Sequence, residues 1–87
     1  MGVQVKQLSV SDTDSSISFS PAVNYVIIKN IGSKRCYFNL NNTATTDHFS
    51  LDPNDEIRIG LLNISSVHAI CVSGESTTLS IIGVDTW

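Results

Sequence analysis

The sequence predicts an all-β fold, a small β-sandwich or jelly-roll-like barrel of about eight short, mostly antiparallel strands. In several segments apolar residues recur at every second position, which is the period of a strand with one buried face. Gly, Pro, Asn, Asp and Ser separate these segments, and such residues favour turns. No segment sustains the 3.6-residue apolar period of a helix.

The first segments predict strands at the start of the chain. Residues 3–10 alternate imperfectly, and we expect residues 1–12 to form an extended arm or an edge strand. Ile17 and Phe19 predict a short strand. It should end at Pro21, because proline cannot donate to a central ladder.

Residues 25–31 are the strongest strand signal, since a continuous run rich in β-branched residues indicates burial on both faces. Residues 36–40 alternate cleanly, which places Cys36, Phe38 and Leu40 on one face. We expect these two segments to form a hairpin.

Residues 49–59 hold two alternating segments on either side of an Asp-Pro-Asn-Asp turn at 52–55. Proline fixes φ in such a turn, and Asn and Asp bond their own backbone. We therefore expect a hairpin or a sheet-to-sheet corner, with Ile57, Ile59 and Leu61 facing inward.

The last two strands are expected at residues 67–72 and 77–83, joined through a Gly-containing hairpin loop at 73–76. We expect residues 84–87 to form a C-terminal tail. The whole chain, 1–87, is predicted to be a single β domain.

Composition narrows the classes of function. The net charge is −3 with five basic residues, which argues against non-specific binding to nucleic acid. No apolar run approaches the roughly 20 residues of a membrane span, and the first residues lack the pattern of a secretory signal. We therefore expect no membrane partner and synthesis in a cytoplasm.

The two cysteines, Cys36 and Cys71, each lie in an apolar alternating segment. They are expected to be buried as small hydrophobic side chains. A disulfide would require neighbouring strands, and a cytoplasmic origin disfavours one. Their separation does not fit a zinc site.

The histidines are the first candidates for chemistry. His48 lies beside Asp47 and Ser50, but neighbours on a strand point to opposite faces, and triads gather residues from separate elements. His68 lies in an alternating strand and could face solvent or a neighbouring subunit. A metal pair of the two histidines lacks a third identifiable ligand. We expect no catalytic residue, no cofactor and no metal.

Two acidic clusters could bind a cation, Asp12 with Asp14 and Asp52 with Asp55 and Glu56. Neither matches the calcium loop of an EF-hand. Turn formation explains the second cluster better, and calcium is kept as the alternative interpretation.

The strand-and-turn pattern over roughly residues 23–83 resembles small β-sandwich virion proteins of tailed bacteriophages. These are capsid decoration (cement) proteins or head–tail accessory proteins. The resemblance lies in Phe49-x-Leu51-x-Pro53-Asn54-x-Glu56-Ile57 and in residues 26–32, 36–38, 67–75 and 78–81. It carries no catalytic motif. It implies a non-enzymatic structural protein of the virion, made in the host cytoplasm, that contacts copies of itself and the major capsid protein.

The candidate contacts with such partners are exposed apolar, charged or aromatic residues near an expected edge, turn or terminus. They are Val3, Val5, Leu8, Lys34, Arg35, Tyr37 and Trp87. The alternative function is a carbohydrate- or receptor-binding module of a tail or head fibre, which would bind glycans through Tyr37 or Trp87. A small hydrolase built on Asp47, His48 and Ser50 is the third class considered.

Overall fold

The computed structural model describes the backbone of residues 2–85 and all of their side chains except that of Leu62. This part of the chain is all-β, as expected, and forms one antiparallel sheet in the order β1-β6-β2-β5-β3-β4. It contains no helix that could cross a membrane. The strands are β1 (Gly2–Val10), β2 (Ser15–Asn30), β3 (Cys36–Leu40), β4 (Phe49–Leu51), β5 (Glu56–Ile70) and β6 (Thr77–Asp85).

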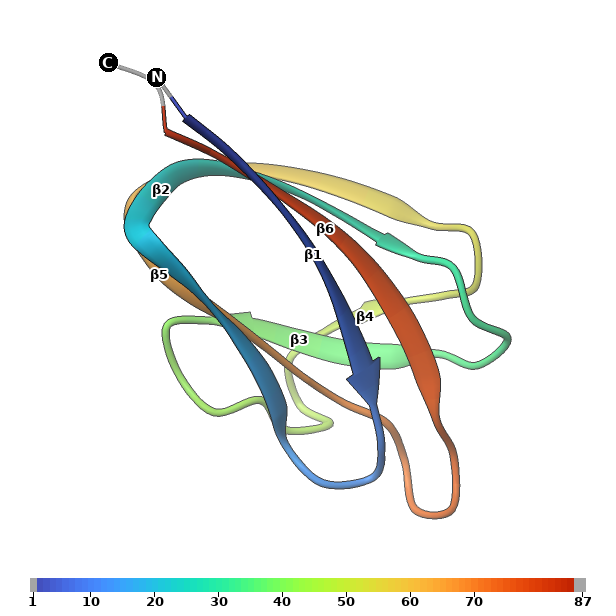
Figure 1. Ribbon diagram of the computed structural model, residues 1–87. Helices are drawn as coiled ribbons and strands as arrows, with labels where there is room; N and C mark the ends of the chain where they lie inside the picture. Colours follow the sequence, from blue (N-terminus) through green and yellow to red (C-terminus); the bar gives the residue numbers. More distant parts are fainter. Residues whose placement is uncertain (1, 86–87) are drawn as a thin grey trace.

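Two long strands, β2 and β5, bend the sheet onto itself (Figure 1). The second half of β2 pairs with β6, while the second half of β5 pairs with β3. The first layer thus contains β1, β6, the second half of β2 and the first half of β5. The second layer contains β3, β4, the first half of β2 and the second half of β5. The pairing of β2 with β5 shifts register between Ser18 and Val23 and again between Val23 and Tyr25, and such bulges bend and twist a strand.

The bend explains why the described residues form six strands where about eight were expected. Pro21 does not end a strand, because it lies at the irregular part of β2, where the ladder is interrupted. Residues 57–61 and 67–70 of two expected segments likewise belong to the single strand β5. Val84 and Asp85 were expected in a tail, but they belong to β6.

The core lies between the two layers and draws side chains from all six strands. Cys36 and Phe38 face it as predicted, and Leu40 packs against it. Ile57 and Ile59 are only partly buried, and Leu61 is 50% exposed, so the inward orientation expected for this segment is correct only in part. The buried residues of the core are Leu8, Val10, Phe19, Val23, Val26, Ile28, Cys36, Phe38, Leu51, Ile64, Val67, Ala69, Cys71, Leu79 and Ile81.

Both expected hairpins are wrong. Residues 25–30 pair with β5 and β6, not with β3. Strands β5 and β6 are not neighbours either, so residues 73–76 are a connection between layers. Turn residues predict where the chain changes direction, but they do not specify which strand it meets next.

Asn30 occupies the point where the layers meet, and its side chain is fully buried. Its Nδ2 donates to the carbonyl oxygens of Lys34 at 2.7 Å and Leu51 at 2.8 Å. Its Oδ1 accepts from the Gly32 N–H at 3.0 Å and from the Thr77 Oγ at 2.7 Å. One amide therefore joins the end of β2, the following turn, β4 and β6.

The turn at residues 52–55 is a corner and not a hairpin, because β4 pairs with β3 and not with β5. Asn54 has a φ of 70°, a conformation that Asn tolerates better than most residues. The Asp52 N–H donates to Asp55 Oδ2 at 3.1 Å, and the Asp55 N–H donates to the Asp52 carbonyl at 2.9 Å. The acidic residues thus act as turn formers, as predicted.

Strand β1 is an edge strand and not a detached arm, since it pairs with β6 from Gly2 to Val10. It also contributes Leu8 and Val10 to the core. Gln4 joins it to the bend of β2, because Gln4 Nε2 donates to the Pro21 carbonyl at 2.9 Å and Gln4 Oε1 accepts from the Ser20 N–H at 3.1 Å. Deleting this segment would therefore damage the fold.

Candidate functional site

The outer surface of the first layer carries an apolar patch that we call the valine face. Antiparallel pairing places directly opposite residues on the same side of a sheet. Val84 is opposite both Val3 and Tyr25. The valine face consists of Val3, Val5, Tyr25, Ile27, Ile82 and Val84.

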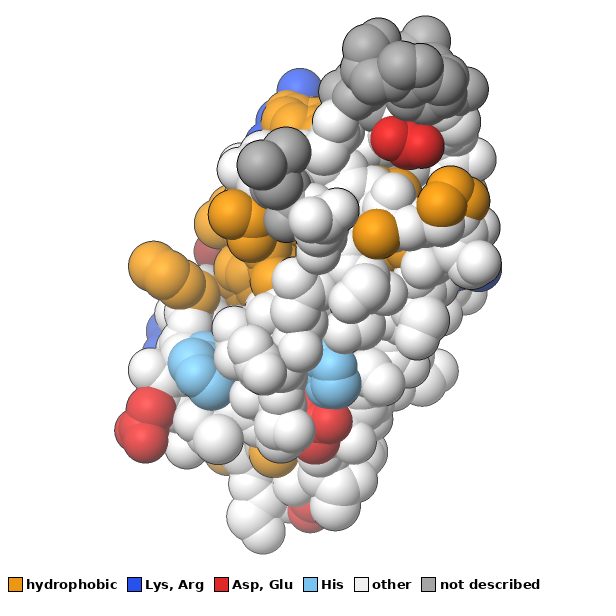
Figure 2. Space-filling view, turned by 90° about the vertical axis from the view of Figure 1, so that its left-hand side faces the viewer, with side chains coloured by type: hydrophobic (Ala, Val, Ile, Leu, Met, Phe, Trp, Pro, Cys, Tyr) orange, Lys and Arg blue, Asp and Glu red, His pale blue; other side chains and the backbone are white. Residues whose placement is uncertain are grey.

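The valine face is unusual because the solvent side of an antiparallel sheet is normally polar. Val3 is 61% exposed and Val5 is 70% exposed, and the other four residues are partly exposed. In Figure 2, many of the exposed hydrophobic side chains lie in the upper half of the molecule. The patch reaches β1, whose outer edge has no partner strand among the described residues. An apolar patch beside a free strand edge is suited to association.

The valine face contains two of the predicted contact residues, Val3 and Val5. Leu8 was expected to contact a partner, but it is 6% exposed and belongs to the core. The reason is the alternation along β1, which turns Leu8 and Val10 toward the interior. Trp87 lies outside the described residues.

The predicted charged tip is paired within the chain. Lys34 Nζ lies 3.8 Å from Glu75 Oε2, and Arg35 Nε donates to Asp52 Oδ1. The hydrogen bond to Asp52, followed by one to Tyr37, raises the pKa of Arg35 above its ordinary value. Tyr37 is half-buried. These three residues are therefore less available to a partner than Val3 and Val5.

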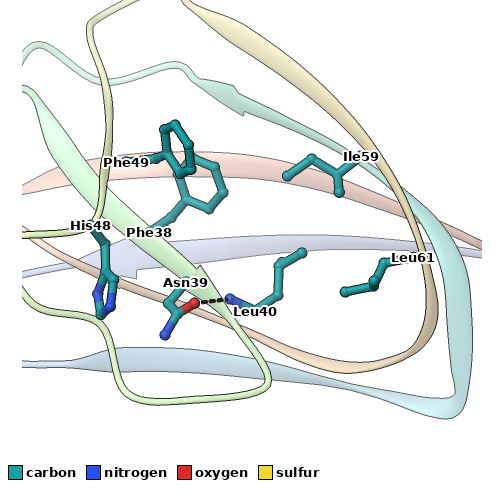
Figure 3. A pocket seen from close by; sticks show the side chains of 7 residues that line it. All are labelled: Phe38, Asn39, Leu40, His48, Phe49, Ile59 and Leu61. Atoms are coloured by element: carbon teal, nitrogen blue, oxygen red, sulfur yellow. Dashed lines mark hydrogen bonds between the residues drawn. The ribbon is translucent and has the colours of Figure 1, made fainter.

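An open groove lies where the two layers separate on the side of β4 (Figure 3). It has a volume of about 330 Å³. Phe49 is 76% exposed, and its ring stacks on the buried Phe38 at a centroid distance of 6.2 Å. The groove is lined by Phe38, Asn39, Leu40, His48, Phe49, Ile59 and Leu61.

Asp47, His48 and Ser50, the hydrolase triad considered from the sequence, do not form a chain of hydrogen bonds from acid to base to nucleophile. His48 Nδ1 accepts from the Thr45 N–H at 2.9 Å, and Asp47 N–H donates to Thr45 Oγ at 3.3 Å. Ser50 is opposite Tyr37 on β3. These bonds shape a turn before β4.

A different Asp–His–Ser arrangement is present, and the sequence interpretation missed it. His68 Nδ1 lies 3.0 Å from Asp14 Oδ2, and His68 Nε2 lies 3.1 Å from Ser66 Oγ. Ser66 and His68 point to the same face of β5 because they are two residues apart. That spacing was visible in the sequence. Asp14 is 54 residues away from His68, and only the pairing of β2 with β5 brings them together.

Asp14 also accepts from the Ala44 N–H at 2.8 Å. Burial raises the pKa of Asp14, but the Ala44 bond and the contact with His68 together lower it by more, so the pKa lies below its ordinary value of 3.8. The ionised carboxylate therefore holds together the start of β2, the loop before β4, and β5.

This shift predicts a pH dependence of stability. A folded-state pKa below the unfolded one stabilises the protein above the unfolded pKa, and the effect is lost as the pH falls through the folded pKa. We expect the difference in free energy of unfolding between wild type and Asp14→Asn to shrink as the pH falls from about 5 to about 2. Urea denaturation at several pH values measures it, and a constant difference would contradict the assignment.

The described residues contain no group of three or more His, Cys, Asp or Glu side chains that could hold a metal ion. Within the second acidic cluster, Asp52 pairs with Arg35 and Glu56 pairs with Arg58. The calcium interpretation of that cluster gains no support from these contacts.

Cys36 and Cys71 are buried free thiols. Tyr37 is opposite Ile70, and the next step in this register places the two cysteines across from each other. Burial, and then the charge of Cys71, raise the pKa of Cys36 to about 12. Burial also raises the pKa of Cys71.

These thiols should be slow to react. Because the thiolate is the nucleophile, we expect iodoacetamide at about pH 8 to alkylate Cys36 in the folded protein on the order of a thousandfold more slowly than in urea. Intact mass spectrometry over time follows both states. Equal rates in the two states would contradict the burial of the thiol.

No protein-family model matches the chain, and no curated protein matches it significantly. Among solved structures, it is similar to a cupin superfamily protein from Desulfitobacterium hafniense DCB-2, with a TM-score of 0.59 and 11% sequence identity. The match covers 97% of this chain and 68% of that chain. The likeness supports the predicted fold class of a small β-sandwich or jelly-roll-like barrel, and at this identity it concerns the fold alone.

Proposed function

We propose that the protein is a non-enzymatic structural protein of a bacteriophage virion that decorates or cements the capsid shell. The observation that carries the proposal is the valine face, which extends to the free edge of β1. In this proposal, the valine face first binds a second copy of the chain. Antiparallel pairing of two β1 edges about a twofold axis would join the two valine faces into one surface.

The physical reasons for association are general. A domain of this size buries a modest share of its surface and is marginally stable alone. Covering Val3 and Val5 would add roughly 1.5 kcal/mol or more for each fully buried side chain. A lattice of identical shell subunits would then bind an oligomer at several points, and multivalency strengthens weak individual contacts.

The assignment to a virion rests on the resemblance of residues 23–83 to small phage proteins. The partners under this proposal are other copies of the chain and the major capsid protein, and the location is the particle after synthesis in the host cytoplasm. Nucleic acid and membranes are not partners in it.

Density-gradient centrifugation of phage particles, purified from a culture that produces this protein, tests the virion assignment. We expect the protein to band with the particles at a fixed ratio to the major shell protein, as quantified by mass spectrometry. Recovery only in the soluble fraction at the top of the gradient would contradict the proposal.

One feature favours a second candidate, a carbohydrate- or receptor-binding module of a fibre. The exposed ring of Phe49 lies beside His48 and Asn39 in the open groove, and an apolar platform with a few polar groups is typical of a ligand site. A glycan array with wild type and Phe49→Ala separates the two functions. Specific binding that is lost in the variant supports the module, and no binding by wild type excludes it.

A further inference from the structure

We infer that Ser66 is an activated nucleophile that accepts an acyl group from small activated esters, with His68 as its base and Asp14 as the positioning residue. The reactivity goes beyond the proposed structural function and does not depend on it. It is carried by the arrangement of three side chains, two from β5 and one from the loop before β2.

The contacts among Asp14, His68 and Ser66 join the atoms that activation of a serine requires. We call this chain of contacts the relay. A serine needs a base nitrogen in hydrogen-bond contact with its Oγ, and the other ring nitrogen needs a group that fixes the ring. His68 Nε2 is 3.1 Å from Ser66 Oγ, and His68 Nδ1 is 3.0 Å from Asp14 Oδ2. Asp14 is itself fixed by the Ala44 N–H.

The relay lies on the outer face of the second layer. Val67 and Ala69 point into the core at 0% exposure, so the residues that alternate with them point outward. The side chain of His68 is 18% exposed and that of Asp14 is 28% exposed. A small reagent can approach from solvent, while the ring is held by its neighbours.

The reaction that this geometry permits is a balanced acyl transfer. Ser66 Oγ forms a bond to the ester carbonyl carbon while His68 Nε2 takes the hydroxyl proton. The ester C–O bond then breaks, the leaving oxygen keeps the electron pair, and His68 returns the proton to it.

The surroundings limit the reaction to a single acylation. The N–H groups of Ser65 and Ser66 donate to Asn41 Oδ1 at 2.7 and 3.2 Å, so they do not stabilise an oxyanion as free backbone donors would. Acylation and hydrolysis both pass through an oxyanion, so this absence slows both steps. An activated ester has a much better leaving group than the alkoxide of serine, so Ser66 should be acylated faster than water hydrolyses the acyl-serine. We therefore expect the acyl-serine to accumulate.

Treatment of the full chain with p-nitrophenyl acetate tests the inference. We expect one O-acetyl group per chain, located at Ser66 by tandem mass spectrometry, with a rate at least about a hundredfold above that of the exposed Ser9, the usual range for general-base catalysis. His68→Gln should lower the Ser66 rate to that of Ser9, and Ser9→Ala should leave it unchanged. Acetylation of Ser66 no faster than Ser9 would overturn the proposal.

The role of Asp14 has its own readout. The rate of Ser66 acetylation is compared between wild type and Asp14→Asn over a range of pH. Asp14→Asn can still accept from the Ala44 N–H but lacks the charge that stabilises imidazolium, so its rate should fall by about tenfold or more across that range. Circular dichroism tests whether each variant is folded. A rate equal to that of wild type at every pH in folded Asp14→Asn would remove Asp14 from the relay.

Discussion

Replacing Asn30 with alanine is expected to lower the free energy of unfolding by about 3–4 kcal/mol, because several buried polar groups lose their partners together. The Lys34 and Leu51 carbonyls would lose a donor, and the Thr77 hydroxyl would lose an acceptor. Each buried unsatisfied group costs about 1–3 kcal/mol, reduced where water can enter. Urea denaturation measures the change.

Two further variants make the Asn30 experiment specific. Asn42→Ala removes the same groups from an exposed loop position, and it should change stability by no more than about 0.5 kcal/mol. Asn30→Asp keeps the shape but places an acceptor against the Lys34 and Leu51 carbonyls, so it should destabilise at least as much as alanine at neutral pH. A loss below about 1 kcal/mol in Asn30→Ala would show that Asn30 does not hold the layers together.

The double substitution Val3→Lys with Val5→Lys is expected to weaken self-association at least about a hundredfold. The two valines are 61% and 70% exposed, so the free energy of unfolding of the isolated chain should change little. Lysines at these positions would bring like charges together across a twofold axis and remove apolar contacts. Light scattering after size-exclusion chromatography measures the association.

A charge-matched control separates the valine face from a general effect of added charge. Ser73→Lys with Ser76→Lys adds the same two charges at exposed positions in the loop before β6, far along the strand from the Val84 end. This variant should associate like wild type. Equal association of all three proteins would show that the valine face is not the contact surface.

The sequence predicted the parts of the fold that depend on local pattern. Alternation in residues 36–40 placed Cys36 and Phe38 in the core correctly. The Asp-Pro-Asn-Asp turn at 52–55 was also correct, since its hydrogen bonds are local.

Strand pairing could not be predicted in the same way. The hairpin expected between residues 25–31 and 36–40 does not form. The Asn30 side chain instead bonds to Leu51 of β4 and Thr77 of β6 at the end of β2. These partners are distant in sequence, so the pattern around Asn30 could not reveal them. The bulges that let β2 and β5 serve both layers leave no local signal of comparable strength.

The candidate sites show the same limit. Val3 and Val5 were selected from the sequence, but their continuation through Ile82 and Val84 to Tyr25 and Ile27 depends on register. His68 was placed in the strand expected at 67–72, but Ser66 was placed just before it, and their relay also requires Asp14 from another element. The histidine that was tested as a base, His48, bonds to Thr45 in its own turn.

Sedimentation equilibrium of the wild-type protein, from about 1 to 100 μM, is the most direct test of the claim that this chain assembles through its valine face. The account predicts a mass that rises with concentration from the 9.4 kDa monomer to at least twice that value. A mass that remains that of the monomer over the whole range would contradict it.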